Sequence, residues 1–95
     1  NGLTIEQVKV YANTQFERSQ MHEIRKGFEN GLAMEQVRVY AVANFTIEQM
    51  SKIKRGFLDG FTMEQVKAYA NPEYSSEKME EVLDKYRLNK LFALL

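Results

Sequence analysis

Apolar residues recur along this chain at intervals of three and four positions, which is the spacing that one face of an α-helix requires. No stretch predicts a strand. The pattern therefore predicts an all-α fold in which each helix turns an apolar stripe toward the core. The first two stripes consist of Ile5, Val8 and Ala12, with Tyr11 beside them, and of Met21, Ile24 and Phe28.

The helical pattern repeats with a period of 29 residues, marked by Gly2, Gly31 and Gly60. A fixed period of this length indicates stacked two-helix units that bury their apolar faces against one another. We expect three tandem repeats stacked as a short α-solenoid, with the first helices on one face and the second helices on the other. The repeats lie at about residues 2–30, 31–59 and 60–88, and a tail at 89–95 is expected to form a short C-terminal helical turn.

The length and the starting point of the chain bear on its organisation. Its 95 residues suffice for one modest core, so residues 1–95 are expected to form a single helical-repeat domain. The chain begins inside its own motif, because Asn1-Gly2 stands where Asn30-Gly31 and Asp59-Gly60 stand later. We interpret it as a fragment of a larger protein.

The starts of the predicted helices carry capping signals. Thr4 and Thr62 are placed as N-caps, each with a glutamine three residues later that can complete a capping box. Thr46 and Ser75 are the corresponding caps of second helices. The equivalent positions in the other helices hold Glu17 and Ala33, which cap poorly.

Glycine and asparagine mark the predicted helix ends. Gly31 and Gly60 follow second helices where a residue with positive φ would close them, and Asn89 stands at the same place in the third copy.

Two further glycines, Gly27 and Gly56, lie in the middle of helices. Glycine there costs about 1 kcal/mol relative to alanine, so we expect close approach of another helix through the small residues Ala12, Ala41 and Ala70. The alternative is that duplication preserved these glycines without a packing role, and Lys85 at the third position shows that the rule has an exception.

The C-terminal tail departs from the repeat. Leu88, Leu91, Phe92 and Leu95 have the spacing of an amphipathic helical turn. We expect this turn to cover the open face of the last repeat. The alternatives are a homodimer contact through Leu91–Leu95 or the start of a further element.

Composition excludes several kinds of chemistry. The chain has no cysteine and one histidine, His22, so neither a thiolate metal site nor a serine triad can be assembled, and we expect no catalytic residue, no metal and no cofactor. No apolar run approaches the roughly 18 to 20 residues that span a bilayer, so we expect no membrane partner. The chain is predicted not to be an enzyme. Its role is expected to be that of an interaction or spacer module.

Charge is neutral overall, with 13 basic and 13 acidic residues, but it differs between copies. Residues 1–29 carry no net charge, residues 30–58 carry +2, and residues 59–87 carry −3. We expect a protein partner that contacts these polarised surfaces. Nucleic acid is the alternative, through basic ridges on the helices. The candidate partner-binding residues are Arg25, Lys26, Lys54, Arg55, Glu77, Glu80, Glu81 and Asp84.

One longer pattern resembles a known kind of repeat. The series Tyr-Ala-x-Pro-x-aromatic-x-x-x-Gln-Met-x-x-Ile-Arg-x-Gly-Phe-Glu-x-Gly, spread over Tyr11 to Gly31 and again from Tyr40 and Tyr69, resembles tandem helical repeats of uncharacterised Gram-positive bacterial proteins, often on mobile elements. Thr14 and Ala43 depart from its proline, and the third copy departs at residues 82–85. The resemblance implies a repeat module in the bacterial cytoplasm and implies no ligand.

Overall fold

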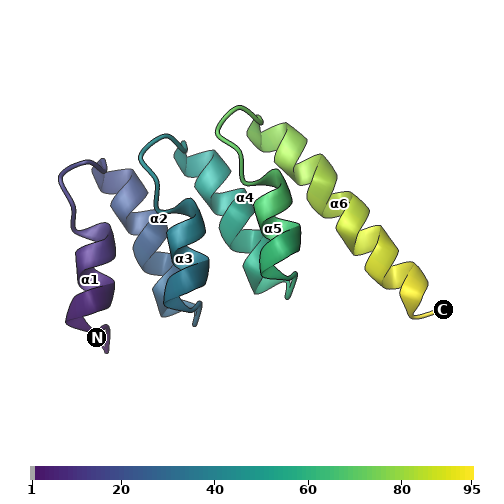
Figure 1. Cartoon of the computed structure of the whole chain (residues 1–95), viewed down its shortest axis with the longest axis horizontal. Coiled ribbons are helices and arrows are strands. Elements are labelled where there is room, and N and C mark those ends of the chain that lie inside the picture. Colours follow the sequence, from purple (N-terminus) through teal and green to yellow (C-terminus); the bar gives the residue numbers. More distant parts are fainter. Residues whose placement is uncertain (1) are drawn as a thin grey trace.

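The computed structural model describes residues 2–95, and this part of the chain is all-helical, with six α-helices and no strand (Figure 1). The predicted all-α class is thereby confirmed. The short helices are α1 (Ile5–Tyr11), α3 (Met34–Tyr40) and α5 (Met63–Tyr69). The longer helices are α2 (Arg18–Glu29), α4 (Ile47–Leu58) and α6 (Ser76–Ala93).

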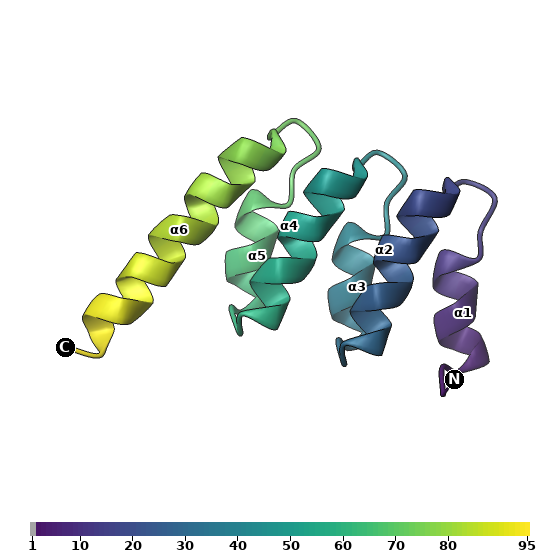
Figure 2. The same cartoon turned by 180° about the vertical axis from the view of Figure 1, so that it is seen from behind.

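The helices form two layers. The short helices lie in front of the longer ones in one view and behind them in the opposite view (Figures 1 and 2). Within the layer of longer helices α2 packs against α4 and α4 against α6, while α3 contacts both α2 and α4. The result is an elongated molecule of 44 × 28 × 18 Å.

Local capping explains where the helices begin. The hydroxyls of Thr4, Thr46 and Thr62 each accept a hydrogen bond from the backbone N–H three residues later, and the glutamine at that position accepts one in return. Ser75 accepts from the backbone N–H of Lys78. At Ala33 only the glutamine half of the box is made, since an alanine side chain offers no acceptor.

Glycine ends α2 and α4 as predicted. Gly31 and Gly60 have φ of 93° and 90°, and the N–H groups that follow reach back to the last turn, as when Leu32 N donates to Gly27 O at 3.0 Å. The predicted stop at Asn89 is wrong, because α6 continues to Ala93. Residues 87–93 contain neither glycine nor proline and are mostly good helix formers, so the tail extends α6 and does not form a separate turn.

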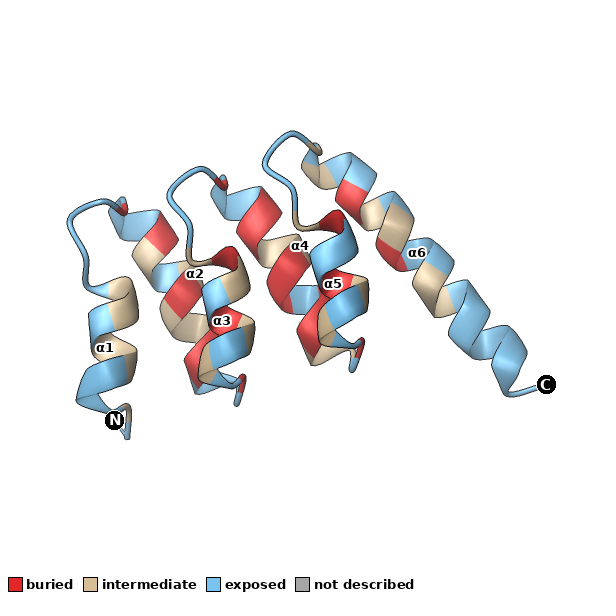
Figure 3. Ribbon diagram, viewed as in Figure 1, coloured by how far each residue is buried: buried red, intermediate tan, exposed pale blue. Residues whose placement is uncertain are grey.

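The core lies between the two layers and thins toward both ends (Figure 3). The short helix α1 has no buried residue. The expectation that Ile5 and Ala12 face the core is wrong: Ile5 is 71% exposed and Ala12 is also exposed. The reason is that α1 packs mainly against α2, whereas α3 is enclosed by α2 and α4.

The mid-helix glycines do permit close approach, but to tyrosine and not to the predicted alanines. A Cβ added at Gly27 would overlap the hydroxyl oxygen of Tyr40, and one at Gly56 would overlap that of Tyr69. Tyr40 donates its hydroxyl hydrogen bond to Glu23 O at 3.1 Å, and Tyr69 donates to Lys52 O at 2.7 Å. Each glycine therefore seats a tyrosine of the next copy against the backbone of the longer helix.

Buried glutamines form a second link between copies. The amide of Gln20 donates to Phe45 O at 2.8 Å and to Ala43 O at 3.3 Å, which belong to the turn of the next copy. Gln49 repeats this link to Tyr74 O at 2.6 Å and to Pro72 O at 2.9 Å. Because these amides are buried, their hydrogen bonds fix the spacing of neighbouring turns.

Candidate interaction site

Lys54 is not available on a basic ridge. Its side chain is 8% exposed, and its ammonium group lies 2.9 Å from the carboxylate of Glu23 on α2. The expectation that Lys54 belongs to an exposed basic ridge is therefore wrong. Lys54 projects between α4 and α2, and a buried ammonium group requires a close counter-ion to offset its lost hydration.

The other three basic candidates stay at the surface beside acidic residues. Arg25 pairs with Glu29 at 2.8 Å on the same helix. Lys26 and Arg55 each lie 4.0 Å from a carboxylate, those of Glu23 and Asp59 respectively. With Lys54 withdrawn, the structure does not bring the four basic candidates together as one uninterrupted positive surface.

The four acidic candidates share the exposed side of α6. Glu80 accepts from Lys52 at 2.9 Å and from Arg87 at 2.7 Å, and the hydrogen bond from Lys52 is the main cause that holds the pKa of Glu80 below its usual value. Asp84 lies 3.0 Å from Arg87. Glu77 and Glu81 are exposed and border an open groove of about 370 Å³ together with Lys52 and Ser76.

Arg87 is the centre of this charged region, and the sequence analysis did not select it. Besides Glu80 and Asp84, it contacts Asp59 through two nitrogens, at 2.9 Å and 3.1 Å. Hydrogen bonds to Glu80 and then to Asp59 raise the pKa of the Arg87 guanidinium above its ordinary value. The spacing of Glu80, Asp84 and Arg87 on one helix face was the available signal, but the contact with Asp59 crosses from α6 to the end of α4.

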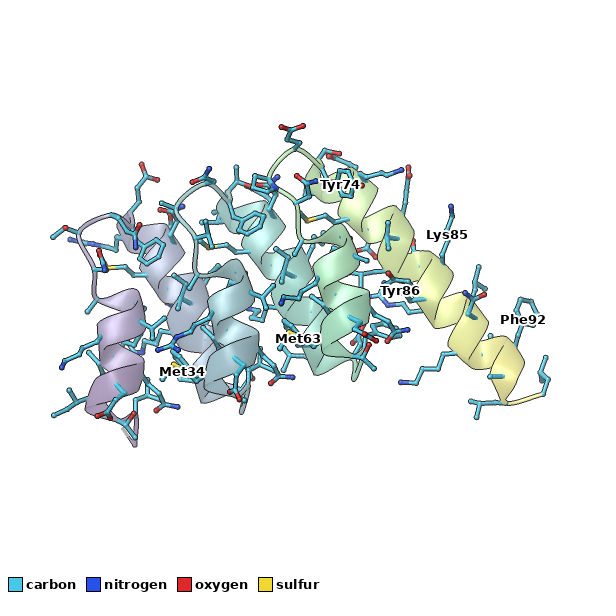
Figure 4. All side chains as sticks on the ribbon, in the orientation of Figure 1. Met34, Met63, Tyr74, Lys85, Tyr86 and Phe92 are labelled. Carbon is cyan, nitrogen blue, oxygen red and sulfur yellow. The ribbon has the colours of Figure 1, made fainter. Side chains whose placement is uncertain are left out.

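The end of α6 carries exposed apolar side chains. Phe92 is 65% exposed and points away from the other helices (Figure 4), and Leu95 is 95% exposed. The expectation that this tail covers the open face of the last repeat is wrong, because α6 runs on beyond the end of α5 (Figure 1). The exposed apolar residues, here called the apolar tail, are Leu88, Leu91, Phe92, Leu94 and Leu95.

The base of the apolar tail is held by polar contacts to the end of α4. Lys90 donates to Asp59 O at 3.2 Å and lies 5.3 Å from the centre of the Phe61 ring. Nearer the start of α6, Tyr86 packs on Phe61 with ring centres 5.4 Å apart and donates to Gln65 O at 3.0 Å. These contacts orient α6, so the apolar tail is presented on a supported helix.

His22 is exposed on α2. Across residues 2–95 no group of three histidine, cysteine, aspartate or glutamate side chains is arranged to hold a metal ion. None of the described helices is both long enough and apolar enough to cross a membrane. Neither a protein-family model, nor a curated protein, nor a solved structure matches this chain, so the geometry itself has to support any functional assignment.

Proposed function

We propose that this chain is a non-catalytic helical-repeat module of the bacterial cytoplasm, which stacks three 29-residue repeats as a short α-solenoid and binds a protein partner. The repeated contacts support the stacking. The same glycine–tyrosine contact and the same glutamine link occur between the first and second copies and between the second and third. Such links join neighbouring copies only, as in other stacked repeat proteins.

The apolar tail carries the assignment of a protein partner. Five large apolar side chains at the end of α6 are between 52% and 95% exposed. Large exposed apolar side chains gathered at one end of a helix are typical of an interaction surface in a folded domain. Two residues of the apolar tail, Leu91 and Leu94, line an open groove together with Arg87 and Lys90. A second groove nearer the start of α6 is lined by Glu77 and Glu81. The matching partner presents an apolar face to the tail and basic residues to Glu77 and Glu81.

A nucleic-acid partner has less support. Phosphate contacts require accessible lysine or arginine side chains along the binding path. Lys54 is buried against Glu23, and Arg25 is paired with Glu29. The remaining cationic side chains therefore offer a weaker path for a polyanion than the sequence spacing suggests.

Site-specific photo-crosslinking tests the protein partner. A photoreactive amino acid is placed at position 92, and the matched control carries it at Lys67, which is exposed on α5. We expect discrete protein adducts in the producing cells from position 92 and none of these from position 67. Equal labelling from both positions would contradict the proposal. Adducts with nucleic acid, formed when the photoreactive amino acid replaces Arg25 or Arg55, would also contradict it.

Light scattering distinguishes a homodimer from a different partner. The chain is compared with a version that lacks Leu91–Leu95. A dimer that becomes a monomer on this deletion identifies a second copy as the partner. If both forms are monomers, pairing through the tail is excluded and the partner is another protein.

A further inference from the structure

The outer face of α1 carries the same kinds of residue that form a buried interface on α3 and α5. On α3, Val37 and Tyr40 are fully buried against α2, and on α5 the same holds for Val66 and Tyr69 against α4. The corresponding residues of α1 are Val8 and Tyr11, which are only partly buried. Within residues 2–95 the main packing partner of α1 is α2, whereas α3 packs against both α2 and α4.

The turn after α1 has carbonyl groups at the positions where the other copies accept hydrogen bonds from a glutamine. Gln20 donates to the turn carbonyls at positions 43 and 45, and the equivalent carbonyls of the first copy belong to Thr14 and Phe16. In the described part of the chain no side chain donates to either of these two oxygens. Gly2 has φ of 90°, the conformation in which Gly31 connects α2 to α3.

The opposite end of the molecule has lost the complementary residues. Lys85 replaces the glycine of α2 and α4, and Figure 4 shows its side chain pointing away from the helices. Lys78 replaces the glutamine, and its ammonium group lies 6.0 Å from the centre of the Tyr74 ring. The helix α6 therefore cannot seat a tyrosine as Gly27 and Gly56 do.

From this asymmetry we infer that the outer face of α1 docks a glycine-bearing helix of the α2 and α4 type, presented by a further copy of the repeat. Glycine in that helix seats Tyr11, and its glutamine binds the carbonyls of Thr14 and Phe16. Helix α6 of a second copy does not fit, because it presents Lys85 at the position where a glycine would have to seat Tyr11. The residues that form this junction are thus present on the acceptor side at α1, whereas α6 lacks the glycine and the glutamine of the donor side.

A fusion tests the docking. Residues 44–59, which comprise α4 and its capping turn, are joined directly ahead of Gly2 in place of Asn1. The matched control is the same fusion with Gly56→Lys in the added segment, which copies the residue found at Lys85. Hydrogen exchange of the α1 amides is measured, with the α3 amides as an internal reference.

We expect the glycine fusion to slow exchange in α1 by about tenfold or more and the lysine fusion to slow it by less than about threefold. Equal protection by the two fusions, or none by either, would overturn the docking. If exchange in the unfused chain slows as protein concentration rises, a second copy occupies the face and the inference is also overturned. Crosslinking at Phe92 reports on a different surface, so its failure would leave the result on α1 standing.

Discussion

Helices α2 and α4 differ from α6 in the residues that they hold at two equivalent positions of the repeat. At α2 and α4 a glycine meets the tyrosine of the following short helix, and a glutamine binds the following turn. At α6 both positions hold lysine, and no short helix follows within the described residues. The comparison teaches that the recurrent glycine and glutamine serve the interface between copies. They are not needed to form a long helix, since α6 forms one with lysine at both positions.

The largest effect is expected where the tyrosine is displaced from its seat. Gly56→Ala should lower the free energy of unfolding by about 2–3 kcal/mol, because the added methyl overlaps the Tyr69 hydroxyl and the crowding outweighs the gain in helix propensity. Urea denaturation measures this change. At the equivalent position of α6, Lys85→Gly should cost about 1 kcal/mol through propensity alone. A stabilising effect of Gly56→Ala would show that the tyrosine seat is not needed.

The buried ion pair offers a second contrast between copies. Lys54 and Leu83 occupy equivalent positions, and Leu83 is fully buried without a charge. Glu23→Ala should destabilise the protein by about 2 kcal/mol, because it leaves the Lys54 ammonium buried without its counter-ion. Adding Lys54→Leu to Glu23→Ala should recover most of this loss in chemical denaturation. A single substitution at Glu23 that costs nothing would argue against a structural role for the pair.

The tyrosine hydroxyl itself is expected to contribute less. Tyr69→Phe removes the hydrogen bond to Lys52 O and should cost about 1 kcal/mol in thermal or urea unfolding. Tyr11→Phe is the matched control and should be close to neutral, because α1 lacks the covering helix. In the Tyr69→Phe background the penalty of Gly56→Ala should shrink, and strict additivity of the two changes would contradict the proposed contact.

The smallest effect is expected from alkaline pH. Burial raises the pKa of Tyr40 and Tyr69 well above the ordinary value near 10, with smaller contributions from Glu23 for Tyr40 and from Tyr86 for Tyr69. The unfolded chain then loses these protons first, so stability is full below about pH 10 and declines above it. At pH 10.5 the loss should stay under about 1 kcal/mol per tyrosine. The double variant Tyr40→Phe, Tyr69→Phe should show a shallower decline, and an unchanged slope would contradict the role of burial.

Sequence alone predicted the features that depend on near neighbours in the chain. Thr4 and Gly31 act within one helical turn, so their cap and stop could be recognised from spacing. The partners of Gly27 and Lys54 could not, because Tyr40 and Glu23 reach them from other helices. A helical period shows which residues share a face, but it does not show which helix covers that face.

The same distinction explains the errors at the two ends. Ile5 fits the helical stripe but is exposed, because no long helix packs on its side of α1. Asn89 occupies the place of Gly60 but remains helical, since asparagine favours positive φ only weakly and nothing else interrupts α6. Of the candidate binding residues, only Lys54 is buried where an exposed side chain was expected. Arg87 was missed because its partner Asp59 lies at the end of another helix.

The glutamine link has a consequence for the order in which the protein is completed during synthesis. The buried amide of Gln20 finds its nearest acceptor 25 residues later, at Phe45 O, and Gln49 likewise waits for Tyr74 O. A nascent chain that has reached position 40 contains α2 but lacks both acceptors of Gln20. The first and second copies are therefore each completed only when the ribosome has added the turn of the copy that follows.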